Sequence, residues 1–286
     1  STRGIYMDDG KKCFCNNFGS MYSMVLPGRR KPSDPGVGGT ARPEKVMEYL
    51  EGHEYMGGVF LWTAFDYFGE PSPFGWPGIS SQFGIADLCG IPKDYYYYYK
   101  AHWVDEAFIH VMPHWNREGL EIDEDGKTRV RVFSNQKSAE LFINGRSFGR
   151  KTLADCSAEW NVEYVSGGIE VRAYDDEGRK TASDVQDTAG SRAGFVLRKV
   201  FSGRTTDLVM IESVDENGTV IPTDDVRVSV EVSGAEVVGL GNGNPSDISK
   251  RSLDEVSLFC GRALAMVKRT ENSAYKIHAE ESISVK

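Results

Sequence analysis

The sequence predicts an α/β region followed by two all-β, immunoglobulin-like sandwiches. In the first hundred residues, helix-type apolar spacing alternates with a short, continuously apolar run. From about residue 104, apolar and polar residues alternate with period two, and Asn-Gly or Gly-Gly pairs separate the runs. The pattern starts again near residue 191. The predicted domains are therefore 1–103, 104–190 and 191–286.

A helix and a buried strand are predicted in the middle of the first region. The segment RPEKVMEYLEGH places Pro43 where the first helical turn accepts proline. Val46, Leu50 and His53 then recur on one helical face. The run YMGGVFLW at 55–62 is continuously apolar, which is typical of a strand buried on both faces in a parallel sheet.

A second helix is predicted for IPKDYYYYYKAHW. Asp94 precedes the tyrosine run and is the predicted N-cap. Five consecutive tyrosines point all round a helix, because successive residues are 100° apart. Some of these rings must be buried, and others must meet water or a neighbouring domain.

The first sandwich is predicted from four alternating runs. TRVRVFSN and SAELFING are followed by Asn144-Gly145, a strong hairpin turn. AEWNVEYVSGGIEVRAYDDEG supplies two more runs around Gly167-Gly168. Trp160, Val162 and Tyr164 share one face by period two, so we expect them to pack in a core.

The second sandwich repeats this pattern. DLVMIESVDENGTVI alternates around Asn217-Gly218, which again reads as a hairpin turn. The further predicted strands are VRVSVEVSG, AEVVGL, RALAMVKR and AYKIHAE.

Composition excludes several classes of partner. The net charge is −9, which argues against nucleic acid and acidic membranes, and the one basic cluster is GRRK at 28–31. No apolar stretch approaches the roughly 20 residues of a membrane span. Five irregularly spaced cysteines, including Cys13 and Cys15, predict neither a zinc site nor a disulfide framework. His102, His110 and His114 match no metal-binding spacing.

One long block resembles a known family. GGVFLWTAFDYFGEPSPFGWPGISSQFGIADLCGIPKDYYYYYKAHW is similar to the end of the catalytic barrel in β-galactosidase-like members of glycoside hydrolase family 2. The family pattern there is G-G-x-x-x-W-T-x-x-D-Y-x-G-E-P, then W-P, then S-x-F-G-x-x-D-x-x-G-x-P-K-D. SNQKSAELFINGRSFGRK and VVGLGNGNP resemble the sandwiches that follow the barrel.

The resemblance implies that the α/β region is the last two βα units of a (β/α)₈ barrel, whose active site lies at the C-terminal ends of the strands. Trp62 would end the eighth strand and line the sugar subsite. Asp66, Glu70 and Trp76 would be hydrogen-bonding or wall residues of the same pocket. For the two carboxylates an alternative stays open, because loop carboxylates also hold loops by accepting backbone N–H bonds.

No catalytic residue is predicted within this chain. Retaining glycosidases need two carboxylates, and in this family the acid/base is the Glu of an Asn-Glu pair, which the sequence lacks. The nucleophile is expected just before Ser1, because STRGIY matches the segment that follows it in the family. A barrel takes about 250 residues, whereas the α/β region has about 103. Asp66 and Glu70 as a substitute pair is the weaker hypothesis, since walls from other strands would be missing.

The functional prediction is therefore the C-terminal part of a retaining glycosidase that acts on terminal β-galactosides. The alternative is a carbohydrate-binding or structural sandwich module, which should carry exposed aromatics on a sandwich face.

The expected partners are a carbohydrate and either the missing barrel portion or a second copy, because a barrel strand without neighbours exposes its edges. Some family members bind Mg²⁺ or Na⁺, but no ligands are assignable here, and no cofactor or metal site is predicted. The chain begins without Met, so the compartment is undetermined, with periplasmic or extracellular locations compatible.

Overall fold

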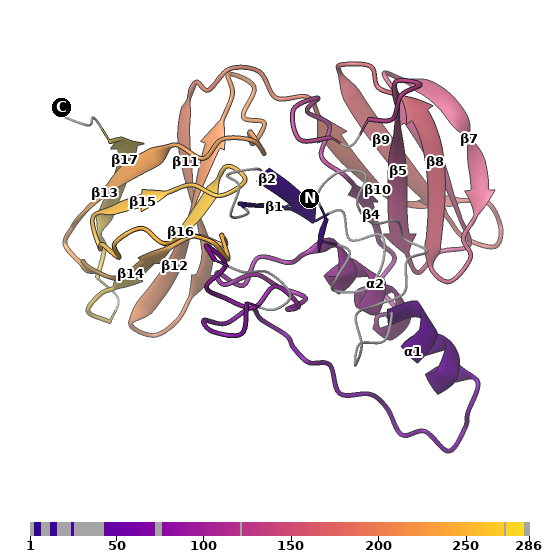
Figure 1. The fold of residues 1–286 in the computed structure, drawn as a ribbon, viewed down its shortest axis with the longest axis horizontal. Helices are drawn as coiled ribbons and strands as arrows, with labels where there is room; N and C mark the ends of the chain where they lie inside the picture. Colours follow the sequence, from indigo (N-terminus) through magenta and orange to yellow (C-terminus); the bar gives the residue numbers. More distant parts are fainter. Residues whose placement is uncertain are drawn as a thin grey trace. The chain divides into compact units, whose positions relative to one another are not determined.

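The computed structural model describes residues 3–6, 12–15, 24–25, 43–71, 76–120, 122–271 and 273–282. The chain divides into two compact units, residues 1–188 and 189–286. Strands make up most of the regular structure, and two helices occur among the described residues (Figure 1). Neither helix, at nine and ten residues, is long and apolar enough to cross a membrane. The domain boundary near residue 103 stays a prediction, because both sides of it belong to the first unit.

The first described element is a small antiparallel sheet of order β1-β2-β3. Its strands are β1 (Arg3–Tyr6), β2 (Lys12–Cys15) and β3 (Met24–Val25). Strand β1 therefore contains the RGIY part of the STRGIY segment. The GRRK cluster at 28–31 lies outside the described residues.

Helix α1 spans Pro43–Glu51, so the prediction of a helix from Pro43 is confirmed. The predicted buried face needs correction. Met47 is the buried residue, at 2% exposure, whereas Val46 and Leu50 are half-buried. His53 lies beyond the end of the helix, so its spacing from Leu50 no longer places it on that face.

The strand predicted at 55–62 is not formed. These residues have no regular secondary structure, and the Phe60 side chain is fully exposed. A strand is stable only when neighbouring strands satisfy its N–H and C=O groups. In the described part of the chain no strand lies beside 55–62, and the nearest pairing is an isolated bridge between Phe65 and Ala86.

Helix α2 spans Asp94–Trp103, as predicted, but the cap prediction is wrong. Lys93 occupies the N-cap position without a side-chain cap bond, and Asp94 is the first helical residue. Asp94 is fully buried, and its Oδ1 accepts a hydrogen bond from His110 Nε2 at 3.0 Å. A buried carboxylate needs such a partner, so Asp94 serves tertiary packing rather than the helix end.

The tyrosines of α2 divide as expected. Tyr95, Tyr98 and Tyr99 are buried, whereas Tyr96 is exposed. The buried rings pack with Met47 of α1 and with residues of the following sheet. Tyr97 stacks on His110, with ring centroids 3.7 Å apart. The helix is thus attached to the first sandwich by its aromatic face.

The first sandwich consists of two antiparallel sheets with orders β4-β5-β8 and β10-β9-β6-β7 (Figure 1). Its strands are β4 (Ile109–Met112), β5 (Lys127–Ser134), β6 (Ser138–Ile143), β7 (Arg146–Thr152), β8 (Ser157–Glu163), β9 (Gly168–Tyr174) and β10 (Lys180–Asp187). Asn144-Gly145 forms the β6–β7 turn with both residues at positive φ, as predicted. Trp160 and Val162 are core residues, and Tyr164 packs against them.

The second unit contains two further antiparallel sheets, of orders β11-β12-β16-β14 and β15-β13-β17. The strands are β11 (Gly194–Ser202), β12 (Thr206–Val214), β13 (Arg227–Ser233), β14 (Glu236–Gly241), β15 (Glu255–Ser257), β16 (Arg262–Lys268) and β17 (Lys276–Glu281). Alternate residues of these strands form one apolar core, so each unit has its own. The edge strand β11 had no counterpart in the sequence prediction, because most of its side chains are exposed.

Candidate functional site

Residues 62–71 and 79–93 form an irregular loop pair that carries the predicted site residues. Backbone hydrogen bonds join them at several points. Ile85 N donates to Thr63 O at 3.0 Å, and Ser81 N donates to Tyr67 O at 2.8 Å. Gly84 is required here, because a Cβ at this position would lie 2.3 Å from the Asp66 backbone nitrogen.

Asp66 is buried, with 6% exposure, and both of its carboxylate oxygens are engaged. Oδ1 accepts the Gly84 N–H at 2.8 Å, and Oδ2 lies 2.6 Å from Lys93 Nζ. Lys93 also donates to the Gln82 carbonyl oxygen at 2.9 Å. Burial raises the pKa of Asp66, and the charge of Lys93 acts in the opposite direction. This geometry favours the loop-holding interpretation for Asp66.

Trp62, Tyr67 and Glu70 form a hydrogen-bonded row on the surface. Trp62 Nε1 donates to Tyr67 Oη at 3.3 Å, and Tyr67 Oη donates to Glu70 Oε2. The Tyr67 and Trp62 rings meet edge-on, with centroids 6.3 Å apart. The hydrogen bond to Glu70 raises the pKa of the Tyr67 hydroxyl, because it favours the protonated phenol. We call these three side chains the surface triad.

The surface triad is open to solvent. Trp62 is 75% exposed, and Glu70 is exposed with its backbone at φ 52°. Few non-glycine residues adopt this left-handed conformation. Phe65 and Phe68 of the same loop are also exposed. A cluster of uncovered large aromatic side chains marks an interaction or ligand surface.

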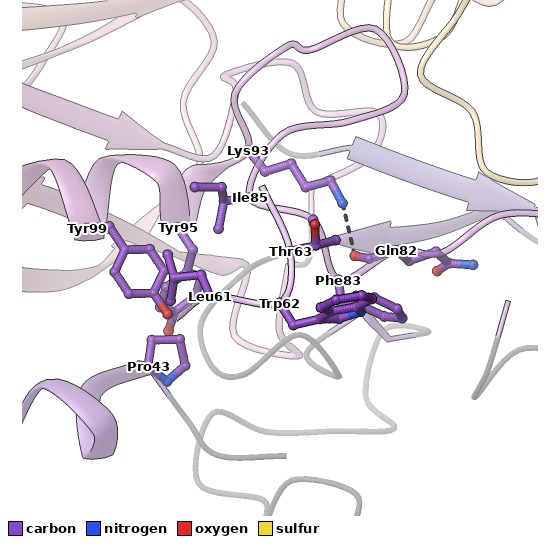
Figure 2. Close-up of a pocket in the computed structure, with 11 residues that line it drawn as sticks. Pro43, Leu61, Trp62, Thr63, Gln82, Phe83, Ile85, Lys93, Tyr95 and Tyr99 are labelled. Carbon is purple, nitrogen blue, oxygen red and sulfur yellow. Dashed lines mark hydrogen bonds between the residues drawn. The ribbon is translucent and has the colours of Figure 1, made fainter. Parts of the chain in front are cut away.

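A small cavity of about 100 Å³ opens beside Trp62. Figure 2 shows its lining side chains, Trp62 and Phe83 among them. Lys93 reaches across toward the Gln82 carbonyl, and Tyr95 and Tyr99 of α2 line another part (Figure 2). The cavity is smaller than the roughly 300 Å³ of ordinary ligand pockets, so the described residues of the loop pair do not enclose a site of that size.

The structure brings some predicted site residues together and separates others. Trp62 and Glu70 are joined through Tyr67. Asp66 faces the buried Lys93 instead of the exposed Glu70. Trp76 is 64% exposed at the far side of a gap in the described residues. The substrate-binding role of all four residues stays a prediction.

Sequence reasoning missed two residues of the site, Tyr67 and Lys93. Both lie inside the quoted block, at its D-Y and P-K-D steps. Neither residue was predicted to belong to the site. A tyrosine among aromatic residues is usually a packing residue, and a lysine after a proline usually lies on the surface. Their roles depend on partners that only the folded chain identifies.

The histidines near the domain junction have structural partners. His102 Nδ1 lies 2.8 Å from Glu51 Oε1, and His110 pairs with Asp94. Burial lowers the pKa of His110. Across the described ranges, no three His, Cys, Asp or Glu side chains come together as a metal ion would require. Cys156 is a free thiol.

Two family models match the sandwiches. Residues 125–182 match a domain of unknown function, DUF4982, and residues 198–282 match glycoside hydrolase family 2 C-terminal domain 5. The first of these ranges lies in the first unit and the second in the second unit.

Curated relatives and solved structures extend the match across the loop pair. The chain is 36% identical over 235 residues to the β-galactosidase BoGH2A of Bacteroides ovatus, covering 79% of this chain and 27% of that protein. It is 29% identical to a putative β-glucuronidase of Formosa agariphila, covering 78% of this chain and 23% of that protein. A β-glycosidase structure from Bacteroides vulgatus matches with TM-score 0.76 and 28% identity, over 84% of this chain and 31% of that one. The chain thus spans about a quarter to a third of these relatives.

Proposed function

Because this chain belongs to glycoside hydrolase family 2, we propose that its loop pair is one wall of the sugar site in a larger retaining β-glycosidase. The proposed substrates are terminal β-galactosides of oligo- or polysaccharides. The chain supplies the wall and two sandwiches, and a part of the protein outside these 286 residues supplies the catalytic carboxylates. The similarity to a β-galactosidase supports the choice of sugar.

The surface triad carries the proposal. The indole of Trp62 is exposed, and its N–H is held by Tyr67, which limits rotation of the ring. A pyranose has an apolar face of C–H groups that packs on such a ring, and its hydroxyl groups need acceptors at the edge. Glu70 Oε2 already accepts from Tyr67, so the carboxylate is oriented to accept from a sugar hydroxyl.

We further propose that residues 1–103 are the last two βα units of a catalytic barrel. The exposed apolar run at 55–62 supports this. A strand of a parallel barrel is apolar on both faces, and the backbone N–H and C=O groups on its two edges stay unpaired until the neighbouring strands are present. In the complete barrel, Trp62 would then stand at the C-terminal end of the eighth strand, where barrel active sites lie. Asp66 and Lys93 would position the loop that follows.

The chemistry would need groups that the described residues do not bring together. A retaining mechanism places two carboxylates about 5–5.5 Å apart, one as nucleophile and one as acid/base, with the sugar between them. Asp66 is buried against Lys93, whereas Glu70 is in water, so they do not frame a common substrate volume. The sequence also lacks the Asn-Glu pair of the family. The wall would therefore bind and orient the sugar, and the nucleophile and acid/base would act from elsewhere.

Saturation-transfer difference NMR with methyl β-D-galactopyranoside tests the proposal on the 286-residue chain. The wild type should give a saturable signal in the millimolar range, and Trp62→Ala should abolish it. Trp103→Ala is the matched control, because Trp103 is also exposed but stacks on Tyr99 of α2. Absence of a saturable signal in the wild type would refute the proposed wall.

The alternative function is a binding module with exposed aromatic residues on a sandwich face. The aromatic residues of β8 and its end, Trp160 and Tyr164, do not support it. Trp160 is 3% exposed, and Val162 and Tyr164 pack with it in the core of the first sandwich. The exposed aromatic cluster lies on the loop pair instead.

A further inference from the structure

The surface triad carries the negative charge of Glu70. We infer that Glu70, held by Tyr67, makes this wall bind neutral pyranosides and reject uronides. The inference rests on the proposed sugar site and adds a residue-level basis for its specificity. Glu70 is the specificity-determining group, and Tyr67 is a positioning residue that acts through it.

The first step is the charge balance of the wall. Lys93 is the cation of the loop pair, but its side chain is 8% exposed and is bound to Asp66. Those two charges offset each other inside the loop pair, and the remaining buried carboxylate, Asp87, accepts the backbone N–H groups of Cys89 and Ile91. Glu70 is left as a negative charge at the surface, and in the described part of the chain Tyr67 is its hydrogen-bond partner, with no Lys or Arg paired to it.

The negative charge of the wall determines which sugars it recognises. Carboxylates of uronic acids are bound by Arg or Lys, which match their charge and geometry. A protein carboxylate does the reverse, because it attracts hydroxyl donors and repels another carboxylate. At 4 Å the repulsion is about 1 kcal/mol in water and several times larger as water is excluded, which corresponds to a preference of about fivefold or more.

Tyr67 holds the carboxylate of Glu70 in a fixed position. Tyr67 N donates to Ser81 Oγ at 3.0 Å, and its ring packs edge-on against Phe83 at 5.8 Å. The hydroxyl therefore has little freedom to follow Glu70, and it holds the carboxylate next to Trp62. Without this bond, a glutamate on an exposed loop would spread over several rotamers, and both attraction and repulsion would weaken.

The test compares methyl β-D-galactopyranoside with methyl β-D-glucuronoside on the same 286-residue chain, by saturation-transfer titration at pH 7. The wild type should bind the galactoside at least about fivefold more tightly. In 1 M NaCl the preference should shrink, because the screening length falls to about 3 Å. A purely structural role for Glu70 would not respond to salt in this way.

Two variants separate the roles. Glu70→Gln keeps the side-chain shape and the Cβ at positive φ but removes the charge, so the two ligands should bind within about twofold of each other. Tyr67→Phe keeps the ring contacts and loses both hydroxyl hydrogen bonds, so it should weaken galactoside binding and reduce the preference. Tyr96→Phe, at an exposed tyrosine of α2, is the matched control and should change neither.

The outcomes distinguish this inference from the proposed function. If neither glycoside binds the wild type, the sugar site itself is refuted, and the inference with it. If both bind equally, or if Glu70→Gln keeps the full preference, the wall exists but Glu70 does not select the sugar.

Discussion

Residues 55–62 are continuously apolar and strand β8 alternates apolar with polar residues, yet only β8 forms a strand. Trp160 of β8 is 3% exposed, whereas Phe60 is fully exposed. Strand β8 pairs with β5 over seven residues, from Lys127 opposite Glu163 to Phe133 opposite Ser157. The run at 55–62 has no such neighbour in the described part of the chain. An apolar pattern therefore predicts a strand only where the same chain provides its partners.

Hydrogen exchange should show the largest difference between these two regions. Backbone amides of β5 and β8 should be protected roughly a thousandfold more than those of 55–62, because the former open only with the sandwich and the latter are bonded mainly to water. The measurement is residue-resolved exchange on the purified monomer. Equal protection in the two regions would show that the backbone amides of 55–62 have hydrogen-bond partners within the protein.

A matched pair of aromatic deletions should separate the regions energetically. Trp160→Ala should lower the free energy of unfolding of the first unit by about 3–5 kcal/mol, because it leaves a cavity in the core. Phe60→Ala should change it by less than about 0.5 kcal/mol, because that ring is in water. Urea denaturation followed by near-UV circular dichroism gives both values. A large effect of Phe60→Ala would mean that the ring is buried in solution.

These two regions also show how far the sequence alone leads. The start of α1 at Pro43 and the β6–β7 turn at Asn144-Gly145 depend on local backbone preferences, and both are predictable. The cap at Asp94 was mispredicted, because its partner His110 lies sixteen residues away. For the candidate site, the sequence identified the exposed Trp62 and Glu70 but not Tyr67, which joins them. Such pairings arise from packing between segments and leave no periodic signal.

The loop pair should depend on one buried ion pair. Lys93→Met would leave the Asp66 carboxylate buried without its cation, and we expect a loss of about 3 kcal/mol, concentrated at 62–71. Lys137→Met is the control, because Lys137 pairs with Asp176 on the surface and should contribute less than about 1 kcal/mol. Exchange rates at 62–71 in each variant are the measurement. Unchanged rates in Lys93→Met would assign the loop geometry to its backbone bonds alone.

Acid should change the stability contributions of Asp207 and Asp66 in opposite directions. In the second unit, hydrogen bonds from Arg269, and then from Lys199, hold the pKa of Asp207 below its usual value against the effect of burial. Its contribution to stability is therefore present above about pH 4 and is lost as the pH falls further. In the loop pair, burial raises the pKa of Asp66, so its contribution is favourable at low pH and declines as the pH rises above about 4.

Urea midpoints between pH 3 and 6, read separately for each unit by NMR, check these signs. Asp207→Asn should flatten the acid loss of the second unit, whereas Asp66→Asn should make the acid loss of the first unit steeper. A variant whose unit keeps the wild-type pH profile would contradict the assignment of that carboxylate.

The most direct test of the account is hydrolysis of a chromogenic β-galactoside by the purified 286-residue chain. No release above background is expected, because the proposed function assigns sugar binding to the wall and places the catalytic carboxylates outside these 286 residues. Release well above background that is abolished by Asp66→Asn or Glu70→Gln would show a working carboxylate pair within these residues, and it would overturn the proposal that this chain contributes a wall alone.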